Sequence, residues 1–228
     1  PDISIEATGR SASCAARVHR YAAADSKILI GSESSRLTLL GDLVNESQNA
    51  AEISVTGKSG SFTGAASSSD SGIIRLSLGD AAWNVTKSSS LSSLSMGEGG
   101  LLNLSYAGER ASSGYRSLKA ESLAADGTTL SMRFNFDRDR DSQAAGDQLI
   151  LGSANGHLRE HIILSGAAGD LSYSRNWLVS QREGDLIITP HSERELIYQN
   201  GGASAWLLCF VPEGEENSLT DPKKFKEL

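Results

Sequence analysis

The sequence has almost no proline in its interior. Its four prolines are Pro1, Pro190, Pro212 and Pro222. Residues 2 to 189 therefore contain none, and proline is excluded from the middle of sheets because it lacks the N–H that the ladder needs. Short apolar runs such as residues 28–30 recur along this stretch. The composition is rich in serine and glycine, but these runs favour continuous β-structure over disorder.

Cysteine, aromatic residues, positive charge and long apolar runs are also scarce. The two cysteines, Cys14 and Cys209, lie near opposite ends of the sequence, so we expect free thiols rather than a disulfide framework or a metal-binding pair. Aromatic residues make up 6% of the chain, and the formal net charge of −7 provides no attraction for nucleic acid or an anionic membrane surface. No apolar run approaches the roughly 18 residues of a membrane helix.

Alternation of apolar and polar residues with a period of two dominates the sequence, whereas helical periodicity is almost absent. This pattern predicts short strands. We expect them over residues 52–56, 74–78, 83–86, 102–106 and 130–136. Glycine-containing turn signals separate these segments.

Apolar positions also recur at intervals of about 20 residues, which is typical of a solenoid. The equivalent pairs are Val55 and Ile74, Leu76 and Met96, and Val85 and Leu104. Because each repeat has room only for short strands and turns, the predicted solenoid is a parallel β-helix of roughly ten coils. A β-sandwich or barrel would also alternate, but we would expect more aromatic residues and more proline in its loops.

Residues 60–104 contain an ordered series of motifs. A turn of the form S-x-F-x-G is followed by a strand ending in L-x-x-x-x-x-W-x-V-T, then by S-x-L-x-x-L. The matching residues are Ser61, Phe62, Gly64, Leu78, Trp83, Val85, Thr86, Ser90, Leu91 and Leu94.

A second series runs from Tyr115 to Phe210. It contains a D-x-L element, a G-x-H element and a closing W-x-L element. The matching residues are Asp147 and Leu149, Gly156 and His157, and Trp206 and Leu208.

In order and spacing, these motifs resemble the late coils and the C-terminal cap of the passenger domains of Gram-negative autotransporters of the pertactin and AIDA-I kind (type Va secretion). The resemblance implies an all-β fold, a right-handed parallel β-helix (a single-stranded solenoid) with a C-terminal β-hairpin-like cap. It also implies an autochaperone, a terminal segment that folds first outside the outer membrane and on which later coils stack. A stable end can nucleate such stacking because coils are stabilised mainly by their nearest neighbours.

The resemblance divides the chain into passenger coils (residues 1–114), C-terminal coils with an autochaperone-like cap (115–211) and a tail or linker (212–228). The residues expected in the folding cap are Trp177, Tyr198, Trp206, Leu208 and Phe210. Large apolar side chains suit a cap that covers an exposed core, although they would equally fill a wider core.

The predicted function is that of a non-catalytic, surface-exposed segment of an adhesin or related virulence factor, whose C-terminal part promotes passenger folding and secretion. We expect no cofactor, metal, nucleic acid or small-molecule substrate. The expected partners are the chain's own β-barrel translocator, which is not in this sequence, and a host-cell or sister-cell surface. The expected location is the cell surface or the medium of a Gram-negative bacterium, reached through the periplasm and outer membrane.

Two other function classes remain open: a polysaccharide-acting β-helix enzyme, and the stalk of a serine-protease autotransporter with a separate catalytic domain. Residues 157–161 also match H-x-x-E-H, a zinc-protease pattern that requires a helix. We expect a strand there instead, on which His157 and His161 would lie about 13 Å apart and could not share one metal ion.

Overall fold

The computed structural model describes residues 1–7, 14–135, 145–166, 178–190, 197–199 and 205–207. The chain divides into two compact units, residues 1–191 and 192–228. The described residues form strands and turns, and none of them belongs to a helix that could cross a membrane.

The described residues of the first unit form sixteen strands. In chain order they are β1 (Asp2–Glu6), β2 (Cys14–Val18), β3 (Lys27–Gly31), β4 (Arg36–Leu40), β5 (Asp42–Asn45), β6 (Glu52–Thr56), β7 (Ser59–Gly64), β8 (Ala66–Ser68), β9 (Ile73–Ser77), β10 (Ala82–Val85), β11 (Ser89–Met96), β12 (Leu101–Asn103), β13 (Ser117–Asn135), β14 (Gln148–Ser165), β15 (Val179–Glu183) and β16 (Leu186–Pro190). The strands predicted from alternation are all present. Four of them are shifted by at most a few residues at their ends, whereas the strand predicted over residues 130–136 is the end of the much longer β13.

These strands stack in three sheets, and every pairing between them is parallel. Sheet 1 consists of β1, β4, β7, β10 and β12, followed by the second halves of β13 and β14, and then β16. Sheet 2 consists of β2, β5 and β8, then the first parts of β11, β13 and β14, and β15. Sheet 3 consists of β3, β6 and β9, then later parts of β11, β13 and β14. The fold is therefore the predicted parallel β-helix and not a sandwich.

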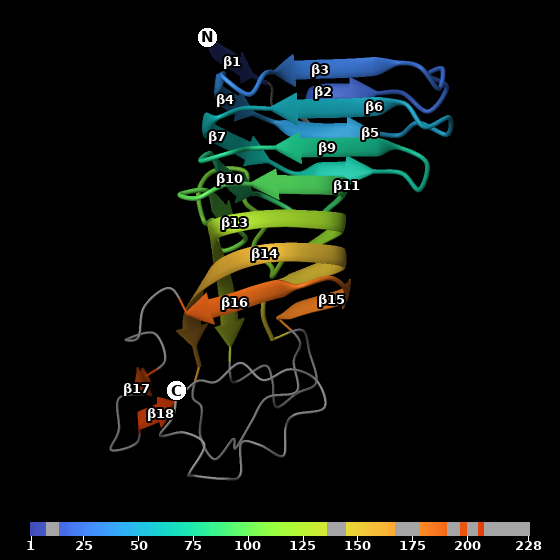
Figure 1. Cartoon of the computed structure of the whole chain (residues 1–228). Helices are drawn as coiled ribbons and strands as arrows, with labels where there is room; N and C mark the ends of the chain where they lie inside the picture. Colours follow the sequence, from blue (N-terminus) through green and yellow to red (C-terminus); the bar gives the residue numbers. More distant parts are fainter. Residues whose placement is uncertain (8–13, 136–144, 167–177, 191–196, 200–204, 208–228) are drawn as a thin grey trace. The chain divides into compact units, whose positions relative to one another are not determined.

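The chain passes through sheets 1, 2 and 3 in turn and winds in a right-handed sense. In Figure 1, β3, β6 and β9 run to the left at the front, whereas β2 and β5 run to the right behind them. Right-handed connection is the general rule for parallel strands.

Coils begin at β1, β4, β7, β10, β12 and the second halves of β13 and β14, and β16 starts the next one. The described part therefore has fewer coils than the roughly ten expected. Middle coils have the predicted length: Trp83 pairs with Leu102, the spacing predicted for Val85 and Leu104. The first coil is longer, since Ile5 pairs with Leu39. Later coils are longer because loops enlarge them, and partners in β13 and β14 lie about 30 residues apart.

Two of the predicted equivalences are offset by two residues. Val55 pairs with Leu76 rather than Ile74, and Leu76 pairs with Leu94 rather than Met96. An offset of two leaves every side chain on the same face of its strand. The apolar pattern alone therefore could not distinguish the observed register from the predicted one, which differs from it by two residues.

The core is a narrow apolar column, filled from all three sheets. Phe62 and Trp83 lie in consecutive coils of sheet 1, and their rings stack with centroids 5.3 Å apart. The indole Nε1 of Trp83 donates a hydrogen bond to the carbonyl of Gly64 at 3.0 Å, so this large side chain is buried without an unpaired donor.

Glycine permits a tight corner between sheets 3 and 1. Gly156 has φ +101°, and a Cβ built there would lie 1.8 Å from the carbonyl oxygen of Ala125 in the preceding coil. Both the backbone conformation and the close approach exclude a side chain at this position.

The second unit contains one described element, the antiparallel pair of β17 (Ile197–Gln199) and β18 (Ala205–Leu207). A hairpin-like pair thus exists in the region where the cap was predicted.

Candidate functional site

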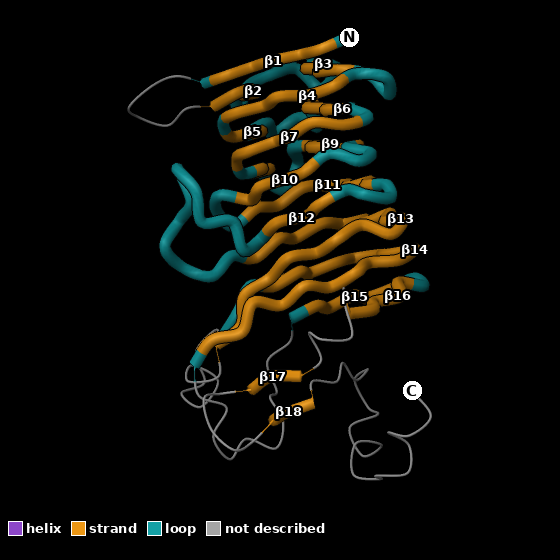
Figure 2. Tube along the Cα trace, turned by 90° about the vertical axis from the view of Figure 1, so that its left-hand side faces the viewer, coloured by secondary structure: helices purple, strands orange, loops and turns teal. Residues whose placement is uncertain are grey.

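The corner between sheets 1 and 2 is where coils differ most from one another. A single residue, Gly41, separates β4 from β5, and Ala65 alone separates β7 from β8. Between β12 and β13, in contrast, residues 104–116 form a long loop, the large teal loop beside β10 and β12 in Figure 2. Loops set on a rigid scaffold commonly carry function, so this corner is the candidate site.

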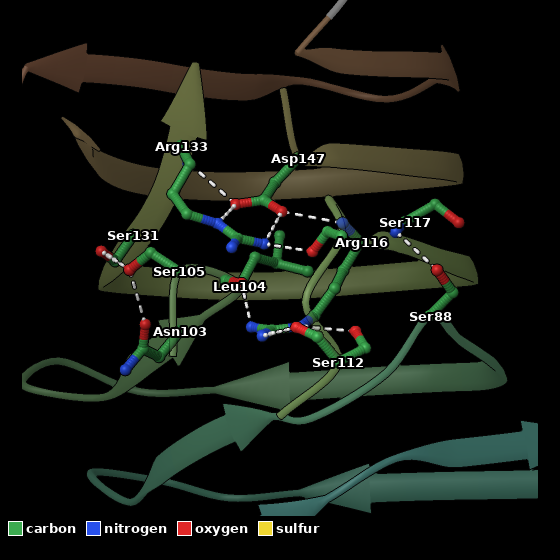
Figure 3. Close-up of polar contacts among 11 residues, drawn as sticks. Ser88, Asn103, Leu104, Ser105, Ser112, Arg116, Ser117, Ser131, Arg133 and Asp147 are labelled. Carbon is green, nitrogen blue, oxygen red and sulfur yellow. Dashed lines mark hydrogen bonds and ion pairs between the residues drawn. The ribbon is translucent and has the colours of Figure 1, made fainter. Parts of the chain in front are cut away.

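Arg116 closes the base of the 104–116 loop. Its side chain is buried, with Nη1 donating to the carbonyl of Leu104 at 2.6 Å and Nη2 to the carbonyl of Ser112 at 3.0 Å. Its Nε also donates to Oγ of Ser112 at 3.3 Å. One guanidinium thus satisfies carbonyls from the start and the end of the loop (Figure 3).

Asp147 joins this loop base to the next coil. Its carboxylate is fully buried and accepts hydrogen bonds from the backbone N–H of Arg116 at 2.8 Å and of Arg133 at 2.8 Å. Nε and Nη2 of Arg133 donate to the two carboxylate oxygens at 2.9 and 2.7 Å. Nη2 of Arg133 also donates to the carbonyl of Gly114 at 2.8 Å. We call Arg116, Arg133 and Asp147 the Asp147 clamp (Figure 3).

The two arginines of the Asp147 clamp have opposite electrostatic environments. The hydrogen bond to Asp147 raises the pKa of Arg133. Burial lowers the pKa of Arg116, and the positive charge of Arg133 lowers it further. Bidentate arginine–carboxylate pairs are among the strongest charge-assisted contacts. The primary ion pair is therefore Arg133 with Asp147, while Arg116 mainly holds carbonyl groups.

The far part of the 104–116 loop runs back along the solenoid. The backbone N–H of Ser112 donates to the carbonyl of Thr86, in the preceding coil, at 2.7 Å. Nη2 of Arg110 donates to the carbonyl of Ala7, at the end of β1, at 2.7 Å. Coils of a solenoid ordinarily contact only their neighbours. This loop instead links the fifth coil to the first.

A ladder of polar side chains follows the outer face of sheet 1 beside the loop. Nδ2 of Asn84 donates to Oγ1 of Thr63 at 3.2 Å, and Nδ2 of Asn103 donates to Oδ1 of Asn84 at 3.0 Å. Ser105 continues the ladder, donating to Oδ1 of Asn103 at 2.8 Å and lying 2.7 Å from the hydroxyl of Ser131. These contacts stabilise stacking between coils.

The polar groups of the Asp147 clamp are paired with one another or with backbone groups. Asp147 is fully engaged by donors, and both arginines of the clamp are committed to it or to carbonyl groups. In the part of the chain that the structure describes, no three histidine, cysteine, aspartate or glutamate side chains come together to hold a metal ion.

The H-x-x-E-H segment lies on β14 and is a strand, as predicted. His157 and His161 are half-buried on the outer side, and the ring of His157 lies 2.7 Å from Oγ1 of Thr189. Glu160, however, points into the core. Only 2% of it is exposed, and burial raises its pKa to about 7. The alternation that places Leu158 in the core also places Glu160 there, and this signal was missed.

The Arg116 and Arg133 contacts were also missed. Asp147 precedes Leu149 and Leu151 at the same strand parity, and a carboxylate at a core-facing position requires buried donors. The need for buried donors to Asp147 could be predicted from the sequence, but the identity of those donors could not.

The predicted folding-cap residues are described only in part. Tyr198 and Trp206 lie directly opposite each other in the β17–β18 pair. Trp177, Leu208 and Phe210 lie outside the described residues, as do Cys209 and the tail. Cys14 is a free thiol.

No family model, curated protein or solved structure matches this chain. The resemblance to autotransporter passengers therefore stays a prediction that rests on the residues quoted above.

Proposed function

We propose that this chain is a non-catalytic, surface-exposed passenger segment of a Gram-negative autotransporter adhesin or related virulence factor. Its C-terminal part would promote folding and secretion of the passenger. The observation that supports the proposal most is that residues of the quoted motifs occupy repeated structural positions in a parallel β-helix. Phe62 and Trp83 stack in consecutive coils, Gly64 accepts the indole hydrogen bond, and Gly156 forms a corner.

The polar chemistry of the described residues agrees with a scaffold. The Asp147 clamp and the Asn84–Asn103 ladder use their donors and acceptors on one another and on backbone groups. An enzyme would instead need a nucleophile, base or metal ligand directed toward a substrate. A binding role requires none of these, and surface loops such as 104–116 could supply its contacts.

A folding role for the C-terminal part is supported by the distribution of interactions along the solenoid. The longest strand pairing, between β13 and β14, lies there, and the Asp147 clamp joins the same coils. A solenoid segment of high local stability can nucleate the stacking of further coils.

The location is tested by protease accessibility. The chain is produced with its natural flanking sequence in a Gram-negative host, and proteinase K is added to intact cells. We expect digestion of the chain while a periplasmic marker survives. Full protection of the chain in intact cells, with digestion only after lysis, would refute surface exposure.

The folding role is tested in the same cells by deleting residues 178–211. The matched control deletes the first coil, residues 1–31, and thereby removes a coil without touching the C-terminal segment. We expect the C-terminal deletion to reduce the surface-exposed, protease-resistant fraction much more than the control does. Equal effects of the two deletions would count against an autochaperone-like segment.

A further inference from the structure

Sheet 1 presents one column of residues to the core, and this column changes character at its seventh member. In register from the first coil onward, the column consists of Ile5, Leu39, Phe62, Trp83, Leu102, Leu130 and Glu160, and Pro190 of β16 follows Glu160 in register. Six of the first seven side chains are apolar. A carboxyl group therefore occupies a position that each preceding coil fills with a hydrocarbon or aromatic side chain.

Glu160 has no compensation for its burial. It is 2% exposed, and neither Oε1 nor Oε2 has a hydrogen-bond partner. Asp147, equally buried in the coil before, accepts four hydrogen bonds and forms an ion pair with Arg133. Burying a carboxylate without a partner is far more costly than burying the neutral acid. Glu160 is thus the group whose ionisation the core resists.

Among the described residues, no charged group of the elements packed against Glu160 points toward it. On its own strand, Arg159 and His161 have the opposite parity and lie on the outer face. Its partner on β13 is Leu130, and β16 contains no titratable residue. The remaining described titratable residues of the region from β13 to β16 are exposed, half-buried on the outer face or held in the Asp147 clamp; these are Lys119, Glu121, Asp126, Arg133, Asp147, His157, Arg182, Glu183 and Asp185. Burial is accordingly the cause of its raised pKa of about 7.

We propose that Glu160 acts as a proton-controlled latch on the C-terminal coils: its neutral form packs in the core column, and its ionisation loosens the coil to which the second half of β14 and β15 belong. Ionisation requires only the loss of the carboxyl proton to water. The coil is therefore most firmly closed in acid and opens more readily at neutral pH. This property is independent of the proposed passenger function.

The direction of the pH dependence follows from the linkage between proton binding and folding. A carboxyl group whose pKa is raised in the folded state contributes full stability below its ordinary pKa of 4.5, and this stability is lost as pH rises toward about 7. Above that range the loss is complete. For these two values, the closed-to-open ratio of the coil falls about 40-fold between pH 5 and pH 7.

Hydrogen exchange of the full chain measures this ratio locally. Protection of peptides from β14, corrected for the intrinsic pH dependence of exchange, should fall about 40-fold from pH 5 to pH 7. In Glu160→Gln, which keeps the shape but cannot ionise, that fall should disappear. The matched control Glu183→Gln removes an exposed carboxylate from β15. In this control the fall in protection between pH 5 and pH 7 should remain. An unchanged pH dependence in Glu160→Gln would overturn the proposal.

Two further measurements cover the case in which Glu160→Gln does not fold. Glu160→Leu restores the apolar column and should fold with pH-independent protection of β14. In the unmodified chain, the carboxyl carbon of Glu160, followed by NMR, should titrate near pH 7. A midpoint near pH 4.5 would refute the latch.

Discussion

Replacement of Asp147 by alanine is the most direct perturbation of the candidate site. The carboxylate accepts two backbone and two side-chain hydrogen bonds, so its removal affects the 104–116 loop and the start of β14 together. The backbone N–H groups of Arg116 and Arg133 would both lose this acceptor, and that of Arg116 would be left buried. The guanidinium of Arg133, whose side chain is 23% exposed, could still turn toward water.

The expected loss of folding free energy follows from the unpaired N–H of Arg116 and from the partial exposure of the Arg133 side chain. Breaking a buried ion pair by removing one partner typically costs about 3–5 kcal/mol, and one unsatisfied buried N–H accounts for about 1–3 kcal/mol of such losses. Because Arg133 can be partly rehydrated, we expect about 3 kcal/mol for Asp147→Ala. Arg133→Ala leaves Asp147 buried with only its two backbone donors and should cost a similar amount.

The assay is urea denaturation combined with hydrogen exchange of peptides spanning residues 104–135. The free energy of opening should fall by about 3 kcal/mol in Asp147→Ala, and the double variant with Arg133→Ala should lose less than the sum of the single losses. Asp126→Ala, which removes an exposed carboxylate from β13, is the control and should change little. A loss below about 1 kcal/mol in Asp147→Ala, or additive single losses, would refute the clamp as a stabilising unit.

Three further variants test the core, a corner and the cap. Trp83→Ala removes a fully buried indole and should cost about 3–5 kcal/mol in thermal or urea denaturation; a loss near zero would contradict the close packing of the column. Gly156→Ala places a Cβ against the carbonyl of Ala125 and should lower the melting temperature, whereas Gly114→Ala, with no atom within 4 Å, should not. Trp206→Ala should lower the thermal stability of the C-terminal half, measured by limited proteolysis, and unchanged protease resistance would contradict the cap prediction.

The strands could be predicted from the sequence because one side of each strand faces the core and the other side faces outward. In β6, for example, Ile53 and Val55 are buried, while Glu52, Ser54 and Thr56 alternate with them on the outer face. A period of two marks this arrangement locally, and a repeat of about 20 residues implies that similar segments stack. Pairing register was less accessible, since Val55 could be matched with Ile74 or Leu76 without moving any side chain to the other face.

The candidate site was accessible only in part. Asp147 was identified within a motif, but Arg116 and Arg133 lie 31 and 14 residues from it in the chain, and only the stacking of coils brings them within hydrogen-bond distance. The contact of Arg110 with Ala7 spans 103 residues and depends on how the loop runs along the solenoid. No local pattern encodes such distances.

By itself, the sequence determined that the chain would form a parallel β-helix, because proline-free alternation and a regular repeat reflect packing rules that operate within one coil. Tertiary structure alone decided which polar groups became partners. Asp147 and Glu160 both lie at core-facing positions by strand parity. Asp147 accepts hydrogen bonds from two arginines, whereas the carboxyl oxygens of Glu160 have no hydrogen-bond partner. The physical reason is that burial depends on local periodicity, whereas compensation of a buried charge depends on side chains supplied by other coils.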